Sequence, residues 1–61
     1  MKANELTCLR WCSEGKTARD IADIENTTYG NVRFFIRNAK TALGVTSLAQ
    51  ATALAKELGL I

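Results

Sequence analysis

The sequence predicts an all-α fold, a single small domain of four helices, and three observations carry this prediction. The chain has 61 residues, with no proline and only four glycines, a composition that suits a helical bundle. Hydrophobic residues make up 48% of it, far too many for a disordered chain. They recur at the spacing of amphipathic helices, with start and stop signals between the stretches. We therefore expect residues 1–61 to form one domain.

The first helix is expected over residues 3–14, and Gly15 ends it in the left-handed conformation that closes many helices. Its inward positions are Leu6, Leu9 and Cys12, with Cys8 at the edge of the core. Cys8 and Cys12 are the only cysteines, and without histidine they are too few for a closed zinc site. We interpret them as small buried apolar residues in a reducing compartment.

The second helix is expected to begin at Thr17, which forms a capping-box pattern with Asp20, and to end near Glu25. Its core candidates are Ile21, Ala22 and Ile24, of which Ile21 is the clearest. Asn26 suits a left-handed position in the turn that follows. Because this turn has only about four residues, the second and third helices are predicted to form a helix-turn-helix.

The third helix, with Thr28 as its N-cap and Gly44 as its end, divides into two faces. One face is an apolar stripe of Val32, Ile36, Ala39 and Leu43, flanked by Phe35. The opposite side carries Arg33, Arg37, Asn38 and Thr41. Two arginines one turn apart, on the exposed face of a helix whose back is buried, suit a probe of the DNA major groove.

The fourth helix opens at a second capping-box pattern, Ser47 with Gln50, and Gly59 ends it. Its inward stripe is expected to be Leu48, Ala51, Leu54, Ala55 and Leu58. Its outer face reads Ala49, Thr52, Ala53 and Lys56. Because three of these four side chains are small, another helix can approach closely, and we interpret this face as a homodimer contact. The alternative is an exposed face that is rich in alanine for helix propensity alone.

The polar residues around the second and third helices predict how the chain meets DNA. Arg33 and Arg37 are the candidates for base readout, because an arginine can bind guanine O6 and N7 with two hydrogen bonds. The candidates for phosphate contacts are Lys16, Thr17, Thr28, Tyr29 and Asn31, with Arg19 beside them. Ordinary solvated polarity is the competing interpretation. The net charge of +2 permits nucleic-acid binding without indicating it.

Phe34 is a further candidate for base readout, because it falls near the middle of the polar face of the third helix. An exposed phenylalanine there is expected to contact something. A thymine methyl group or a sugar is one candidate partner, a neighbouring side chain is another, and the sequence leaves the two open.

No constellation for catalysis is visible: the chain has no histidine, no glycine-rich phosphate loop and no paired carboxylates in a plausible pocket. We therefore predict a protein that is not an enzyme and that uses no metal or cofactor. No apolar run approaches the roughly 20 residues of a membrane span. No secretory signal is visible either, so we expect a cytoplasmic protein without membrane contact.

Several short motifs stand in order along the chain: Glu5, Leu9 to Trp11, Gly15 to Thr17, Ile21 with Ala22, Val32, Leu43 to Val45, and Gln50 with Ala51. Each motif is loose, but the ordered set is highly specific and covers nearly the whole chain. It resembles the LuxR-type helix-turn-helix domain. Within that family the closest likeness is to the TraR-like quorum-sensing regulators.

The resemblance implies that Arg33 and Arg37 read bases and that the last helix mediates two-fold pairing. Double-stranded DNA is then the main partner, and RNA polymerase is a further one. Residues 1–61 would be the C-terminal part of a longer regulator, whose N-terminal domain binds an acyl-homoserine lactone. Phe34 and Phe35 stand where the family commonly has polar residues, a departure that bears on the DNA sequence preference. Lys2 stands where it usually has a capping threonine.

Two functions of different classes follow. The first is the DNA-binding domain of a transcriptional regulator that binds an inverted-repeat operator as a homodimer, with the third helix in the major groove. The second is a stand-alone interaction module that pairs with a full-length relative through the fourth helix and inhibits it. Binding to DNA that weakens with salt discriminates the first from the second.

Overall fold

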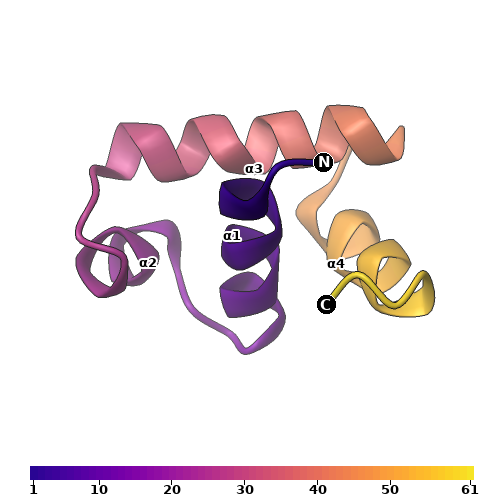
Figure 1. The fold of residues 1–61 in the computed structure, drawn as a ribbon, viewed down its shortest axis with the longest axis horizontal. Helices are drawn as coiled ribbons and strands as arrows, with labels where there is room; N and C mark the ends of the chain where they lie inside the picture. Colours follow the sequence, from indigo (N-terminus) through magenta and orange to yellow (C-terminus); the bar gives the residue numbers. More distant parts are fainter.

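The computed structural model describes all 61 residues, and they form four helices without a strand. The helices are α1 (Ala3–Ser13), α2 (Ala18–Ile24), α3 (Tyr29–Leu43) and α4 (Leu48–Glu57). In Figure 1, α3 runs across the molecule, and α2, α1 and α4 lie in that order along one side of it. The predicted all-α fold of four helices is confirmed. None of the helices combines the length and the apolar character needed to cross a bilayer.

The helix ends follow the local signals in the sequence. Each predicted N-cap accepts the backbone N–H of the residue three positions later, at 3.1–3.2 Å: Thr17, Thr28 and Ser47. Asn26 adopts the left-handed conformation (φ 53°) in the turn between α2 and α3, as predicted. Helix α1 begins directly after Lys2, which offers no side-chain cap. Instead, the Lys2 backbone N–H donates to the carboxylate of Glu5 at 3.2 Å, and Glu5 is buried.

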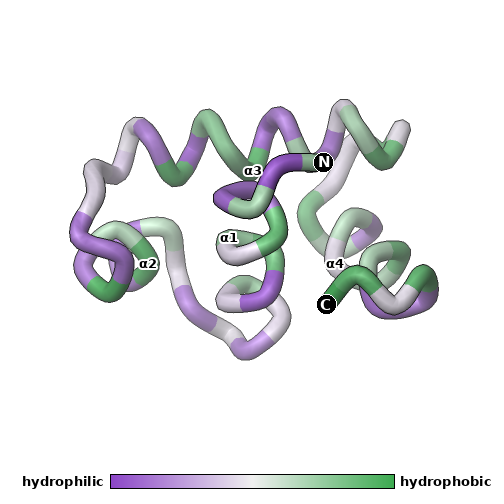
Figure 2. The backbone as a smooth tube through the Cα atoms, viewed as in Figure 1, coloured by the Kyte–Doolittle hydropathy of each residue, from purple (hydrophilic) through white to green (hydrophobic).

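The core consists of two clusters, and both α1 and α3 contribute to each of them. One cluster joins α1, α2 and α3 through Cys8, Ile21, Ala22 and Val32. The other joins α1, α3 and α4 through Leu9, Ala39, Ala51 and Ala55. Figure 2 shows hydrophilic and hydrophobic bands alternating along α3, as expected for a helix with one buried face. Because α3 contributes Val32 to one cluster and Ala39 to the other, burial fixes the rotation of the whole helix.

The expected roles of the two cysteines were reversed. Cys8 is buried, with 3% of its surface exposed, whereas Cys12 is only half-buried. Helix α1 runs away from α3 along its length (Figure 1), so Cys8 packs with Val32 in the cluster, while Cys12 lies one turn further from α3. Both cysteines are free thiols.

Three other residues expected in the core are exposed. Ile24 is 46% exposed and Leu58 is 59% exposed, and Leu48 lies at the boundary with 36%. Each stands at the end of its helix, Ile24 and Leu48 as a terminal residue and Leu58 as the C-cap of α4. The hydrophobic period continues to these positions, but none of the three residues packs in or against either core cluster.

Candidate nucleic-acid interface

The outer face of α3 is uncovered and positively charged. Helix α3 carries Arg33, Arg37 and Lys40, three of the eight basic residues in the chain, and none of the six acidic ones. Arg33 and Arg37 are exposed, while Val32 and Ala39 behind them have no exposed surface. The other three helices lie along the opposite side of α3 (Figure 1), so both guanidinium groups are accessible to a ligand.

Tyr29, the first residue of α3, holds two arginines from the two helices of the motif. The Arg33 Nη1 atom donates a hydrogen bond to the Tyr29 hydroxyl at 3.0 Å. The guanidinium carbon of Arg19, in the first turn of α2, lies 4.9 Å from the centre of the Tyr29 ring, a cation–π distance. The i, i+4 spacing of Tyr29 and Arg33 was a signal in the sequence for their hydrogen bond. The contact between Arg19 and Tyr29 depends on how α2 packs against α3, which the sequence does not reveal.

Arg37 has a different environment from Arg33. Its guanidinium makes no hydrogen bond to another residue of the chain, unlike that of Arg33. The backbone carbonyl of Arg37 accepts a hydrogen bond from the Thr41 hydroxyl at 3.1 Å. Arg37 is therefore free to make all of its hydrogen bonds to a ligand.

Phe34 lies between the two arginines in sequence and is 54% exposed. Its ring is 6.1 Å from that of Phe35, at an interplanar angle of 59°, the tilted geometry that aromatic pairs prefer. Phe35 is half-buried and packs against the cluster that contains Val32. A neighbouring side chain thus supports the Phe34 ring from one side, and more than half of its surface stays open.

The candidates for phosphate contacts lie at the N-terminal ends of α2 and α3. Lys16, Thr17, Thr28 and Tyr29 are all exposed there. Thr17 also exchanges hydrogen bonds with Asp20, and these bonds hold the pKa of the Asp20 carboxyl below its ordinary value. Lys16 and Thr17 make no hydrogen bond to α3, whereas Arg19 of α2 contacts the Tyr29 ring.

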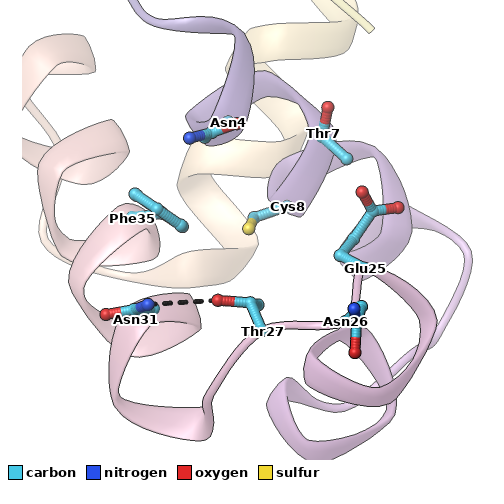
Figure 3. Close-up of a pocket in the computed structure, with 8 residues that line it drawn as sticks. All are labelled: Asn4, Thr7, Cys8, Glu25, Asn26, Thr27, Asn31 and Phe35. Atoms are coloured by element: carbon cyan, nitrogen blue, oxygen red, sulfur yellow. Dashed lines mark hydrogen bonds between the residues drawn. The ribbon is translucent and has the colours of Figure 1, made fainter.

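Asn31 points sideways toward the turn between α2 and α3, where its amide Nδ2 donates to the Thr27 hydroxyl at 3.1 Å (Figure 3). The amide group has a second N–H, which remains available. Asn31 borders a hollow of about 380 Å³, lined also by Asn4, Thr7, Cys8, Glu25, Asn26, Thr27 and Phe35. The carboxylate of Glu25 in this hollow accepts a hydrogen bond from Trp11 Nε1 at 2.9 Å, and its charge disfavours a phosphate there.

The Cys8 thiol in the hollow is not a reactive group. Burial, with contributions from Cys12 and Glu25, raises the pKa of Cys8 to about 11. Because the thiolate is the nucleophile, a thiol with this pKa is inert near neutral pH. Burial likewise raises the pKa of Cys12.

The outer face of α4 has the small residues that the sequence predicted. Ala49, Ala53 and Lys56 are exposed, and Thr52 is half-buried. The Thr52 hydroxyl donates to the carbonyls of Leu48 and Ala49 at 3.2 and 3.1 Å. Since this hydroxyl already has acceptors in its own helix, the face presents no unsatisfied side-chain polar group apart from the Lys56 ammonium.

Two adjacent helices joined by a short turn, the second of them uncovered and cationic, define a helix-turn-helix domain. Comparison with known families agrees: the model of the bacterial regulatory proteins of the luxR family matches residues 3–55. The chain therefore belongs to the luxR family, as its motifs predicted.

Its relatives are transcriptional regulators. The chain is 46% identical to the transcriptional activator protein TraR of Agrobacterium vitis over 57 residues, which cover 93% of the chain and 24% of that protein. It is 45% identical to the transcriptional activator protein VanR of Vibrio anguillarum over 51 residues, 84% of the chain and 21% of that protein. The quorum sensing-dependent transcriptional regulator VjbR of Brucella ovis is 39% identical over 57 residues, 93% of the chain and 22% of that protein. The chain thus spans at most about a quarter of the length of these relatives.

Proposed function

We propose that this chain is the sequence-specific DNA-binding domain of a quorum-sensing-type transcriptional regulator. In this proposal α3 enters the major groove of an inverted-repeat operator, to which the protein binds as a homodimer in the cytoplasm. The observation that carries the proposal is the outer face of α3, where Arg33 and Arg37 are exposed on a helix without carboxylates. The printed names of the relatives, transcriptional activators and a quorum sensing-dependent regulator, support it.

Base readout is assigned to Arg33, Arg37 and Phe34, which lies between the two arginines in the sequence. Each guanidinium can bind O6 and N7 of a guanine, and such a pair contributes about 1–3 kcal/mol of discrimination against the wrong base. Tyr29 takes only one of the five N–H groups of Arg33, so a bidentate pair with guanine can form while this bond persists.

The phosphate contacts are assigned to Lys16, Thr17, Thr28, Tyr29 and Asn31, that of Tyr29 through its backbone N–H at the start of α3. The Thr17 and Thr28 hydroxyl oxygens accept backbone N–H groups, which leaves each hydroxyl hydrogen free to donate to a phosphate. Free backbone N–H groups in the first turn of α3 add to this, because the N-terminal end of a helix attracts anions. Contacts of this kind position the protein without reading sequence, and they weaken as salt rises.

The homodimer contact is assigned to the outer face of α4, through Ala49, Thr52, Ala53 and Lys56. Small exposed side chains let the backbones of two symmetric helices approach closely. A dimer of this kind would insert its two α3 helices into major grooves about 34 Å apart. RNA polymerase, and an acyl-homoserine lactone bound by an N-terminal domain, are partners proposed for the longer regulator by likeness to its family.

The test of base readout is Arg37→Ala, measured by fluorescence anisotropy on a duplex site selected from a randomised pool. We expect the ratio of affinities for the selected and scrambled duplexes to fall by about 5- to 150-fold per half-site. Arg10→Ala is the matched control, because Arg10 is also an exposed arginine but lies on α1. An unchanged ratio in Arg37→Ala would remove Arg37 from the readout.

The test of the dimer is Ala53→Glu, measured on duplexes with one and with two half-sites. A carboxylate from each copy would meet at the two-fold axis, so cooperative binding to the two half-sites should be lost, while binding to a single half-site persists. Undiminished cooperativity would rule out this face of α4. The stand-alone inhibitor remains the second candidate, because Phe34 is exposed. Co-purification with a full-length relative, without salt-dependent DNA binding, would favour it.

A further inference from the structure

We infer that Phe34 reads the C5-methyl group of a thymine in the major groove. This inference rests on the proposed function and names the base, and the group on it, that Phe34 contacts. It concerns the one large apolar side chain that α3 exposes between Arg33 and Arg37. A DNA duplex that receives these arginines on its base edges must also receive Phe34.

The surroundings of Phe34 hold its ring in place. An exposed phenylalanine on an isolated helix can move among its rotamers, but Phe34 rests against Phe35, with the ring centres 6.1 Å apart. Phe35 in turn packs against the core cluster. The ring is therefore partly ordered before a ligand arrives, which lowers the entropic cost of using it as a contact.

The side of the ring toward the start of α3 is open. The residue one helical turn before Phe34 is Gly30, and a Cβ atom added there would meet nothing within 4 Å. Gly30 therefore places no side chain between the Phe34 ring and a base edge that approaches from the N-terminal end. This is the end of a recognition helix that contacts bases in helix-turn-helix proteins.

The chemistry of the major groove then selects the partner. The groove edges of guanine, adenine and cytosine present hydrogen-bond donors and acceptors, whereas thymine adds a methyl group. An aromatic ring cannot satisfy the polar atoms and gains free energy by covering the methyl group. A second copy of the chain is a poor occupant for this surface, because the positive charges of Arg33 and Arg37 would repel the same two arginines of the other copy.

The experiment uses the selected duplex and replaces each thymine in turn with deoxyuridine, which pairs identically but lacks the methyl group. We expect one thymine in each half-site at which the replacement weakens binding of the wild-type chain about fourfold. Phe34→Ala should bind the thymine and deoxyuridine duplexes equally. Phe34→Leu, which keeps an apolar side chain, should retain part of the difference, and Arg10→Ala should retain all of it.

Each outcome decides the inference. The inference is overturned if no replacement of thymine by deoxyuridine weakens binding of the wild-type chain. A contact between Phe34 and a sugar would give this result. It is also overturned if Phe34→Ala keeps the same preference for thymine. In both cases the proposed function stands as long as Arg37→Ala still loses discrimination. If the chain selects no duplex at all, the proposed function and the inference fall together.

Discussion

Tyr29→Phe separates two roles that the tyrosine hydroxyl can have at the interface. The substitution removes the acceptor of the Arg33 bond but keeps the ring that Arg19 contacts. As a phosphate contact, the hydroxyl would support binding to any duplex. As a positioning group, it would support only duplexes whose bases Arg33 reads. We expect positioning to dominate, since the 3.0 Å bond to Arg33 already exists without DNA.

The size of the effect follows from the exposure of the pair. Tyr29 is 41% exposed, so the bond itself contributes at the low end for hydrogen bonds, about 0.5 kcal/mol. Without it, DNA binding must order the Arg33 side chain, at a cost of about 0.5–1 kcal/mol. Affinity for the selected duplex should therefore fall about two- to fivefold per half-site, while affinity for a scrambled duplex should stay constant.

The assay is a double-mutant cycle by fluorescence anisotropy with Tyr29→Phe, Arg33→Ala and the combined variant. In the Arg33→Ala background, Tyr29→Phe should have no further effect. Equal losses on selected and scrambled duplexes would refute positioning and assign the hydroxyl to a phosphate. Tighter binding of Tyr29→Phe would also refute it, because the bond would then compete with guanine for Arg33.

Three further predictions concern stability, each measured by urea or thermal unfolding followed by circular dichroism. Leu9→Ala should destabilise the chain by about 3–5 kcal/mol, because Leu9 is fully buried in a cluster whose other buried members are alanines, too small to fill the cavity, whereas Leu58→Ala on the exposed surface should cost under about 0.5 kcal/mol. Thr28→Ala should cost about 1 kcal/mol through the lost N-cap, and Thr28→Ser should restore it. Stability should fall as pH rises from about 9 to 11, because the unfolded chain releases the Cys8 proton first, and Cys8→Ala should reduce this loss.

The sequence was sufficient wherever a feature depends on neighbouring residues. The N-caps at Thr17, Thr28 and Ser47 and the left-handed turn at Asn26 follow from local hydrogen bonding and backbone sterics. The outward direction of the α3 arginines follows from the helical period, since burying Val32 turns the opposite side to solvent. These features account for most of the candidate interface.

The sequence was insufficient where the burial or the contacts of a residue depend on how two helices pack against each other. The order of burial between Cys8 and Cys12 depends on where α1 meets α3, and both positions fit the same hydrophobic stripe. The contact of Arg19 with Tyr29 depends on the angle between α2 and α3. Glu5 was missed as a buried residue because a carboxylate is seldom buried, and here the Lys2 backbone N–H donates to it.

Gly30 provides a last prediction in which stability and binding change in opposite directions. Glycine costs a helix about 0.5–1 kcal/mol relative to alanine, and Gly30 has an ordinary helical backbone with open space around its missing side chain. Nothing within the chain therefore requires a glycine there, and Gly30→Ala should raise the free energy of unfolding by up to about 1 kcal/mol.

We predict that DNA, rather than the fold, favours a glycine at this position. If α3 lies in the major groove, a Cβ atom at Gly30 stands between the helix and the DNA, so Gly30→Ala should bind the selected duplex more weakly than the wild-type chain. Ala42→Gly is a control for helix propensity, because it lies in the last turn of the same helix and should lower stability. A Gly30→Ala variant that is both more stable and equally tight on DNA would show that the first turn of α3 does not approach the duplex closely, and the proposed docking of this end would have to be abandoned.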